Sequence, residues 1–529
     1  MITGKNYVGN DLQTNGTVTF TTFSPKLNLP NSELHFEASD SEINSAVELA
    51  HTAFQTYRGF SGKRKAEFLN AIADEILDLG DELVEVYMKE SGLPEGRAKG
   101  ERGRTIGQLR TFAELVAEGS WVDARIDTAI PDRAPIPKTD LRKMNSALGP
   151  IVVFGASNFP LAYSTAGGDT ASALAAGCPV IVKAHPMHAG TSELVASAII
   201  KAALKTKMPN GIFSNLNSKG IEVGVKLVEH PKVKGVGFTG SIRGGRALYD
   251  LAAKRAEPIP VFAEMGSINP VVIMPEYLNE NNEQVAKTYA GSITLGTGQF
   301  CTNPGLILGI KGTDLDQFIQ TLGEQIQTID PMCMLHPAIS ENFANSKERM
   351  LAQDGLKVVS SYSNQVEPNY AGQMIARVDG ATFKANKNMH QEVFGPYSMV
   401  VECENSDELT AVIDNLEGQL TGTIMATAAE LGDHPELTNS LSNRVGRIIH
   451  NGVPTGVEVC PSMLHGGPYP ASTDSRFTAV GTDSIKRWVR PISYQSWPNE
   501  LLPKELQNHN PLKISRKLNN VDSRDAIVE

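Results

Sequence analysis

The feature that most constrains the fold is a series of short apolar runs separated by segments of helical pattern. After Gly149 and Pro150 these runs are Ile151–Phe154, Val180–Val182, Val233–Phe238, Pro260–Ala263 and Val271–Met274. Continuous apolar strands that alternate with helices are typical of a parallel sheet covered on both faces. The sequence therefore predicts a doubly wound α/β domain, and ligands of such sheets bind at the carboxyl ends of the strands.

The first 120 residues are expected to be largely helical. Ser39 and Glu42 have the spacing of a capping box. Apolar residues then recur at helical intervals, first at Ile43, Val47, Ala50 and Phe54, then at Phe68, Ile72 and Ile76, and again through Leu83–Met88 and Arg97–Val116.

The segment from Asp127 to Leu148 has a different character. Three prolines interrupt it, and Asp140–Met144 then alternates between polar and apolar residues as an edge strand does. The pattern is compatible with an arm that contacts another subunit and equally with a surface hairpin. The tail from Ser484 holds another strand candidate, Trp488–Tyr494, before an end that either wraps a neighbouring subunit or is mobile.

The length of 529 residues exceeds what one ordinary core supports. A second alternating block runs from about Tyr277 to Arg476 and predicts another α/β domain. We expect a first domain made of residues 1–126 and 149–275, a second of residues 276–483, and an arm and tail made of residues 127–148 and 484–529.

Composition narrows the classes of partner. The 48 Lys+Arg and 59 Asp+Glu give a net charge of -11, which argues against a nucleic-acid or anionic membrane surface and favours a small-molecule substrate. The five cysteines never form a Cys-x-x-Cys pair, so neither a disulfide framework nor a metal site is expected. No apolar run resembles a signal peptide or a membrane span, and we expect a cytoplasmic protein.

Cys301 stands in a loop of small and polar residues, Gly298–Gly305, and we interpret it as a nucleophile. A free thiol has a pKa of roughly 8.5, so full ionisation at neutral pH requires on the order of 2 kcal/mol of local stabilisation. The alternative for any single cysteine is a small buried apolar residue. Other segments favour the nucleophile, because they supply an amide donor, a carboxylate and a phosphate-binding turn.

Asn158 and Glu264 are the candidate partners of this thiol. Asn158 follows the first apolar run, and its amide can join the backbone N–H of Cys301 as an oxyanion donor, worth ~3 to 4 kcal/mol. Capping of the next helix is its alternative role. Glu264 ends another apolar run, where a carboxylate can deprotonate a thiol or a water. A structural ion pair is its alternative.

Lys183, Gly240, Ser241 and Lys219 are candidates for binding a dinucleotide. Lys183 closes a strand and can reach a ribose or phosphate, and Gly240 and Ser241 lie in a strand-to-helix turn suited to a pyrophosphate. A simple tight turn also explains the glycines. Pro186 stands where NAD-preferring enzymes place an acid, so NADP should be accepted. Lys219 is then either an additional cation for the 2'-phosphate or an exposed loop lysine.

The order of these motifs, together with Glu392-Val393-Phe394-Gly395-Pro396, resembles the NAD(P)-dependent aldehyde dehydrogenase superfamily from about Ser39 to Tyr494. The resemblance implies an α/β fold with a doubly wound cofactor domain, an α/β catalytic domain and a small β oligomerisation arm. It also implies a homodimer or homotetramer.

The resemblance further implies a role for each motif. Cys301 would attack the aldehyde carbonyl, and Asn158 with the Cys301 backbone would hold the oxyanion of the thiohemiacetal. A hydride would pass to the nicotinamide, and Glu264 would activate the water that hydrolyses the thioester. The cofactor would contact Lys183, Gly240 and Ser241 on the adenosine and pyrophosphate side, and Glu392 and Phe394 at the nicotinamide ribose.

Departures from the usual family pattern indicate one branch of the superfamily. The segments His450–Pro461 and His465–Pro468 replace an aromatic-rich C-terminal segment. With Glu90–Pro94 and Glu101–Arg104 they resemble the 2,5-dioxovalerate (α-ketoglutaric semialdehyde) dehydrogenases and the related NADP-dependent fatty aldehyde dehydrogenase of luminous bacteria. NADP-preferring oxidation of 2,5-dioxopentanoate to 2-oxoglutarate is therefore expected, with NAD possible. The alternatives are a fatty aldehyde dehydrogenase and a non-catalytic relative.

Three more residues are candidates within this branch. His465 aligns with a substrate-lining aromatic residue and either assists proton transfer beside Cys301 or is a structural histidine before a Gly-Gly turn. A substrate that ends in a carboxylate calls for a guanidinium, whose planar fork matches it. Arg102 and Arg104 are the candidates, and their alternative is a pair of surface charges on a helix.

Overall fold

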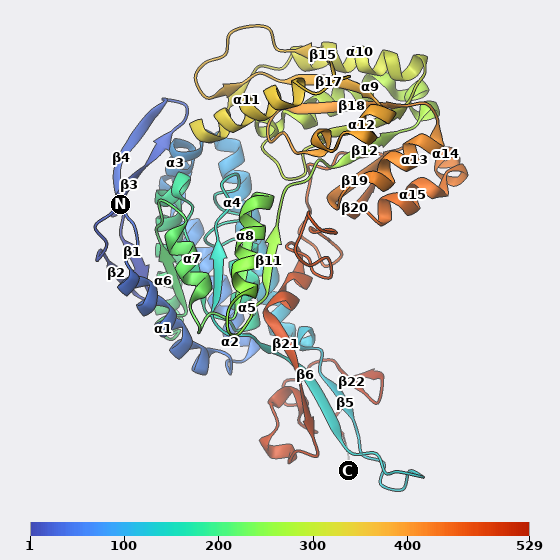
Figure 1. Cartoon of the computed structure of the whole chain (residues 1–529). Helices are drawn as coiled ribbons and strands as arrows, with labels where there is room; N and C mark the ends of the chain where they lie inside the picture. Colours follow the sequence, from blue (N-terminus) through green and yellow to red (C-terminus); the bar gives the residue numbers. More distant parts are fainter. Residues whose placement is uncertain (1, 528–529) are drawn as a thin grey trace.

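The structure, a computed structural model, describes residues 2–527 and contains two large sheets with a smaller arm at one end (Figure 1). The first sheet has the strand order β11 (Val261–Glu264), β10 (Gly235–Thr239), β7 (Ile151–Phe154), β8 (Val180–Lys183), β9 (Phe213–Leu216), β1 (Asn6–Val8) and β2 (Asp11–Gln13). The strands from β11 to β9 are parallel, and β1 and β2 add an antiparallel edge.

Helices cover both faces of this sheet, because alternate residues of its buried strands enter two separate cores. Val152 and Phe154 of β7 belong to one core, and Ile151 and Val153 belong to the other. The helices on the first face are α1 (Asp40–Tyr57), α7 (Glu222–Glu229) and α8 (Ile242–Ala253). Those on the second face are α2 (Gly62–Asp78), α3 (Gly80–Ser91), α4 (Glu95–Glu118), α5 (Gly168–Ala176) and α6 (Ala189–Lys205). The doubly wound prediction is confirmed.

The expectation of a largely helical N-terminal region is correct only from residue 40 onward. The Ser39–Glu42 capping box is present at the start of α1. Before it, β1 and β2 form one hairpin, and β3 (Thr19–Ser24) and β4 (Leu29–Phe36) form another. The sequence carries little signal for β3, because its buried positions Phe20, Thr22 and Ser24 include only one apolar residue.

The second sheet has the order β15 (Lys357–Ser361), β17 (Met374–Asp379), β18 (Tyr397–Cys403), β13 (Leu306–Ile310), β12 (Pro270–Ile273), β19 (Gln419–Met425) and β20 (Val445–His450). The placement of the run Val271–Met274 with the first sheet was wrong, because β12 pairs with β13 and β19. Residues 265–269 alone separate β11 from β12, which is too short for the crossover between parallel neighbours. The second sheet thus begins before the expected boundary at residue 275.

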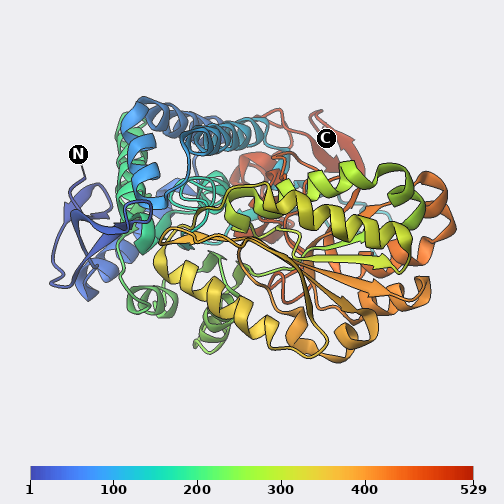
Figure 2. The same cartoon turned by 90° about the horizontal axis from the view of Figure 1, so that it is seen from above.

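Two helical layers cover the second sheet, as the view from above shows (Figure 2). One layer holds α9 (Pro275–Thr294) and α10 (Thr313–Gln327). The other holds α11 (Pro337–Leu351), α12 (Gly380–Ala385), α13 (Ser406–Asn415) and α15 (Pro435–Ser442), with α14 (Ala428–Asp433) at its border.

The arm is a five-stranded sheet of order β21 (Val489–Gln495), β6 (Leu141–Ala147), β5 (Arg125–Asp127), β22 (Arg516–Leu518) and β23 (Val521–Ser523). The edge-strand prediction for Asp140–Met144 was wrong, since β6 lies between β5 and β21. The described part of the tail packs on its own chain, where Leu502, Leu506 and Ile514 join a core with Ile126. Among the described residues, no helix has the length and apolarity that crossing a membrane requires.

Candidate active site

Cys301 is half-buried in the loop between α9 and β13, at the boundary of the two large sheets. Gly298 has a φ of 65°, and a Cβ there would lie 2.2 Å from the Gly395 carbonyl oxygen. Only glycine therefore lets this loop pass so close to the segment that contains Glu392. On the other side, the Phe300 ring packs edge-on against Phe159, with 5.4 Å between the centroids.

Asn269, which the sequence did not reveal as important, holds the cysteine loop from the side of β12. Its side-chain amide donates to the carbonyl oxygens of Cys301 and Asn303, both at 2.8 Å. Its own oxygen accepts from the Ser267 and Thr421 hydroxyls at 2.9 and 3.0 Å. The only signal was an Asn in a turn between two strands, where its φ of 49° is well tolerated.

His465 lies between Cys301 and Glu264 and contacts both. Its Nε2 is 3.4 Å from the Cys301 sulfur, and its Nδ1 is 3.5 Å from Glu264 Oε2. The backbone N–H of His465 donates to the Thr478 hydroxyl, which keeps the imidazole in place. The structure thus brings three predicted catalytic side chains into one line of thiol, imidazole and carboxyl.

Glu264 ends β11 in a buried position, with 6% of its surface exposed. Burial raises its pKa well above the usual range, and the nearby Arg487 guanidinium opposes this shift. Arg487 is itself bound to Asp169 at 2.7 Å. Glu264 therefore resists ionisation, and within residues 2–527 its Oε2 has no well-aligned hydrogen bond.

Asn158 lies beside the same loop, as predicted. Its side-chain amide donates to the carbonyl oxygen of Gln299, two residues before Cys301, at 3.0 Å. Arg97 of α4, which the sequence analysis did not single out, donates to the Asn158 carbonyl at 3.4 Å. Its guanidinium lies 4.3 Å from the Phe159 ring centroid and 4.7 Å from that of Phe300.

The two arginines predicted to bind substrate point in different directions. Arg104 donates to the Tyr163 hydroxyl at 3.0 Å, and the Tyr163 ring lies 5.8 Å from His465. Arg102 instead donates to the Gly80 carbonyl at the start of α3, at 2.6 Å. The assignment of Arg102 to the substrate was therefore wrong, because residues two apart on a helix do not share a face.

Lys183 ends β8 and Ser241 follows the end of β10, so both lie at the carboxyl edge of the first sheet, on either side of β7. Lys183 is 9% exposed, and burial lowers its pKa to about 8, an effect that the Glu37 carboxylate opposes. Ser241 caps α8 by accepting from the Gly244 N–H at 3.2 Å, and Gly240 precedes it at the end of β10. A buried lysine with no ion pair in the described chain and a helix N-terminus, both at the carboxyl edge of one parallel sheet, suit a dinucleotide phosphate.

Lys219 lies in the loop after β9, on the same edge of the sheet. Its backbone N–H donates to Glu37 Oε2 at 2.6 Å, and the Glu37 carboxylate also interacts electrostatically with Lys183. The sequence did not reveal Glu37, because it comes from the β4 end, far from Lys183 in the chain.

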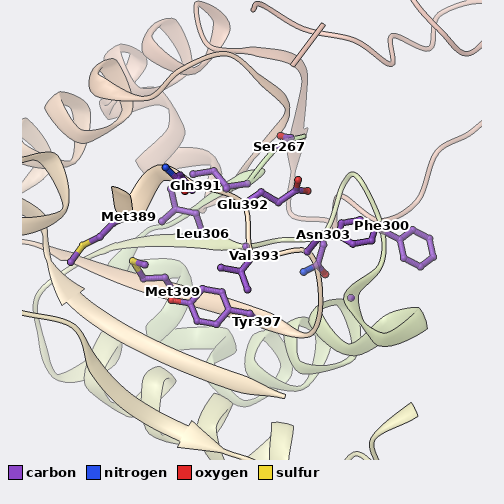
Figure 3. A pocket seen from close by; sticks show the side chains of 14 residues that line it. Ser267, Phe300, Asn303, Leu306, Met389, Gln391, Glu392, Val393, Tyr397 and Met399 are labelled. Atoms are coloured by element: carbon purple, nitrogen blue, oxygen red, sulfur yellow. The ribbon is translucent and has the colours of Figure 1, made fainter. Parts of the chain in front are cut away.

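Glu392 and Phe394 line a cavity beneath the cysteine loop (Figure 3). Gly298, Phe300 and Asn303 line the same cavity, so the predicted ribose-binding segment lies beside the loop of Cys301. Burial raises the pKa of Glu392 to about 7, and a hydrogen bond from the Ser267 backbone opposes this shift. A Cβ on Gly266 would lie 2.5 Å from the Glu392 carboxylate, so a larger residue there would displace the Glu392 side chain.

In the described part of the chain, no cluster of three or more His, Cys, Asp or Glu is arranged to hold a metal ion. The candidate site combines the Cys301 thiol with an imidazole and a carboxyl group, and Lys183 and Ser241 lie at the carboxyl edge of the first sheet.

Comparison with known proteins identifies the family. The profile of the aldehyde dehydrogenase family matches residues 13–476, and the chain belongs to this family.

Two of the similar relatives carry the name of the same enzymatic activity. Alpha-ketoglutaric semialdehyde dehydrogenase 2 of Azospirillum brasilense is 46% identical and covers 97% of this chain and 98% of its own length. Alpha-ketoglutaric semialdehyde dehydrogenase of Acinetobacter baylyi is 45% identical and covers 93% of both chains.

Solved structures share the fold at low identity. A betaine aldehyde dehydrogenase mutant from Staphylococcus aureus in complex with NAD+ has a TM-score of 0.81 at 18% identity and covers 94% of this chain and 98% of its own. A 1-pyrroline-5-carboxylate dehydrogenase mutant from Thermus thermophilus has a TM-score of 0.79 at 18% identity and covers 93% and 92%. The predicted aldehyde-dehydrogenase-like α/β fold is confirmed.

Proposed function

We propose that this enzyme oxidises 2,5-dioxopentanoate to 2-oxoglutarate with a nicotinamide dinucleotide, preferring NADP over NAD. The placement of His465 between the Cys301 sulfur and Glu264 carries the chemical part of the proposal. The substrate is supported by the two α-ketoglutaric semialdehyde dehydrogenases, at 46% and 45% identity over nearly the whole chain.

The residues at the carboxyl edge of the first sheet and in the Glu392 segment fit a dinucleotide. Lys183, Gly240 and Ser241 would hold its adenosine side and pyrophosphate, and Glu392 and Phe394 its nicotinamide ribose. When bound, the cofactor supplies the acceptor for the hydride that leaves the aldehyde carbon. Lys183 and Lys219 would attract a 2'-phosphate, while Glu37 works against it, so the preference for NADP rests on two cations outweighing one carboxylate.

In the first step, His465 Nε2 accepts the thiol proton of Cys301 while the sulfur attacks the aldehyde carbon. The Asn158 amide has a second N–H besides the one bound to Gln299, and this N–H with the Cys301 backbone N–H would hold the oxyanion. Loss of the hydride converts the thiohemiacetal into a thioester on Cys301. Arg97 positions Asn158 through its backbone carbonyl.

In the second step, Glu264 in its ionised form accepts a proton from a water that attacks the thioester carbon. The C–S bond breaks, the acid is released, and the Cys301 sulfur regains a proton from His465. Burial of Glu264 disfavours its charged form, so less negative charge opposes the attack of the Cys301 sulfur, because two like charges close together raise each other's cost.

We also propose the domain division given above, with the second domain beginning near Pro270, and a homodimer or homotetramer joined through the arm. The five cysteines are free, in keeping with a reducing, cytoplasmic environment.

Steady-state kinetics test the proposal. With NADP, kcat/KM for 2,5-dioxopentanoate should exceed that for decanal, and KM should be lower for NADP than for NAD. Cys301→Ala should abolish oxidation and leave the dissociation constant of NADP unchanged, since the thiol reacts only with the aldehyde. A higher kcat/KM for decanal would contradict the substrate and favour a fatty aldehyde dehydrogenase. No activity with any aldehyde would favour a non-catalytic relative.

A further inference from the structure

We propose that Arg104, Tyr163 and Arg447 together bind the carboxylate and the adjacent 2-oxo group of the substrate. This inference rests on the proposed function and adds two residues to the site, Tyr163 and Arg447, that convert a general aldehyde site into one for short 2-oxo acid semialdehydes.

Tyr163 is the centre of this set. Its ring packs against His465 at 5.8 Å, and His465 in turn contacts the Cys301 sulfur. Burial raises the pKa of Tyr163 to about 12, so the hydroxyl keeps its proton at neutral pH. Since Oη accepts from Arg104, the hydroxyl proton points elsewhere, and no described residue accepts it. The hydroxyl is therefore available to donate to a substrate oxygen.

Arg104 approaches Tyr163 from α4. Its guanidinium lies 5.2 Å from the centroid of the tyrosine ring in addition to the hydrogen bond at 3.0 Å. Among residues 2–527 it forms no ion pair, and its Nε is buried without a hydrogen-bond partner. A half-buried guanidinium that lacks an anion next to a reactive cysteine suits an anionic ligand.

Arg447 lies on β20, in the second large sheet. Its Nη1 and Nη2 each donate at 2.8 Å to a loop carbonyl, of Gly456 and Pro454, and Nη1 lies 3.7 Å from the sulfur of Met463. These contacts fix the guanidinium close to the segment that carries His465. Arg447 also lacks an ion pair in the described chain, and its Nε is buried and unpaired.

The surroundings of Arg447 include residues of the candidate active site. Burial lowers its pKa, and the nearby Tyr163 and Cys301 oppose that shift. Thr478 links the two sides geometrically, because its hydroxyl accepts from the His465 N–H at 2.9 Å and lies 3.4 Å from the carbonyl oxygen of Met463, the residue that Arg447 contacts. A five-carbon semialdehyde that has its aldehyde carbon at the sulfur would direct its carboxylate to the two guanidinium groups, and its 2-oxo oxygen to the Tyr163 hydroxyl.

Arg97, Arg102 and Arg110 are the arginines of the same helix that do not belong to this set, and Arg110 is paired with Asp74 at 3.2 Å. Arg97 is paired with Glu101 at 3.4 Å and stacked between Phe159 and Phe300. Arg102 donates to the Gly80 carbonyl, on another face of α4. Arg102 therefore provides a matched control for removal of a charge from α4.

The test compares Arg104→Met, Arg447→Met and Tyr163→Phe with Arg102→Met on three aldehydes in the full-length enzyme. The substrates are 2,5-dioxopentanoate, 4-oxobutanoate, which has the carboxylate without the keto group, and pentanal, which has neither. Loss of either guanidinium should lower kcat/KM by about 30-fold or more for both anionic aldehydes, mostly through KM, and by less than about threefold for pentanal.

Tyr163→Phe should lower kcat/KM for 2,5-dioxopentanoate more than for 4-oxobutanoate, because only the former offers a keto oxygen. Arg102→Met should leave all three substrates unchanged. Arg447→Lys keeps the charge and should recover part of the selectivity for anions. Equal losses on pentanal and the anionic aldehydes would overturn the inference and make Arg447 an anchor of the Pro454–Gly456 loop.

The wild-type enzyme separates this inference from the function on which it rests. If the wild type prefers pentanal or decanal, the proposed substrate is wrong. If the wild type prefers 2,5-dioxopentanoate and all three variants keep that preference, the function stands and this inference alone is overturned.

Discussion

In the proposed reaction, burial of the single residue Glu264 would set the order of the chemical steps. Its carboxyl lies at the end of β11 with 6% exposure, and its pKa is raised well above the ordinary value. A carboxyl whose charged form is disfavoured by burial repels a developing thiolate less, yet it can still accept a proton from water as pH rises. Residue type alone suggested the base, whereas its resting protonation state follows from the packing around it.

Glu264→Gln should separate the two halves of the reaction. We expect a rapid burst of reduced cofactor, followed by turnover about 100-fold slower or more, because the thioester forms but hydrolyses slowly. Stopped-flow absorbance measures the burst, and intact mass measures the acylated enzyme. The wild-type hydrolysis rate should rise with pH as Glu264 ionises, and the variant should lose that dependence. Absence of a burst would contradict the role.

The same variant should change stability in a pH-dependent way. Because the folded pKa of Glu264 is raised, the folded state binds more protons than the unfolded state, and stability falls as pH rises above about 4.5. Glutamine removes this loss, so the difference in thermal midpoint between variant and wild type should grow from acid to neutral pH. A difference in thermal midpoint that stays constant with pH would indicate that folding does not raise the pKa of Glu264.

At the scale of elements, the cysteine loop is held by contacts from several segments that are distant in the chain. Asn269 from the β12 side bonds two of its carbonyls, and Asn158 from the β7 side bonds another. Gly298 allows the loop to lie against the segment of Glu392. The reactive sulfur thus has a fixed position because α9, β7, β12 and the Glu392 segment meet there.

Asn269→Ala should loosen this loop. Two buried carbonyls would lose their donor at a cost of ~1–3 kcal/mol, and alanine is disfavoured at a φ of 49°. Hydrogen exchange in peptides that cover residues 298–305 should become faster, and kcat should fall. Asn269→Gly is the control that accepts the same φ without the amide. If the glycine variant behaves like wild type, the hydrogen bonds do not hold the loop.

At the scale of the whole molecule, the tail completes the arm. Strand β22 covers the edge of β5, and Leu502, Leu506 and Ile514 pack on the arm core. Exposed strand edges and apolar patches promote association with other chains, so the tail limits where another subunit can pair with the arm. Strand β21 remains at the other edge of the arm sheet.

Deletion of residues 496–529 should therefore lower the thermal midpoint and cause higher-order association, because it uncovers β5 and the apolar side chains below it. Each buried Leu or Ile contributes about 1.5–3 kcal/mol. Size-exclusion chromatography with light scattering gives the mass of the assembly. Leu506→Ala serves as control, since it leaves the edge covered and should reduce stability without association. An unchanged assembly after deletion would show that the tail does not protect this edge.

The sequence alone determined the periodicity of the buried strands, the capping box of α1 and the order of reactive residues along the chain. These features are local, because a strand buried on both faces must be apolar and a helix start must satisfy its free N–H groups. The thiol, the amide and the carboxyl could therefore be named before the fold was known.

Only the tertiary structure decided which sheet β12 joins and that the N-terminal hairpins form. It brought the side chains of four residues to the candidate site, namely Asn269, Arg97, Glu37 and Arg447. It also separated Arg104 from Arg102, which are two residues apart in sequence and lie on different faces of α4. The physical reason is that strand pairing and convergence of side chains depend on contacts between segments far apart in the chain. Local pattern carries no information about those contacts.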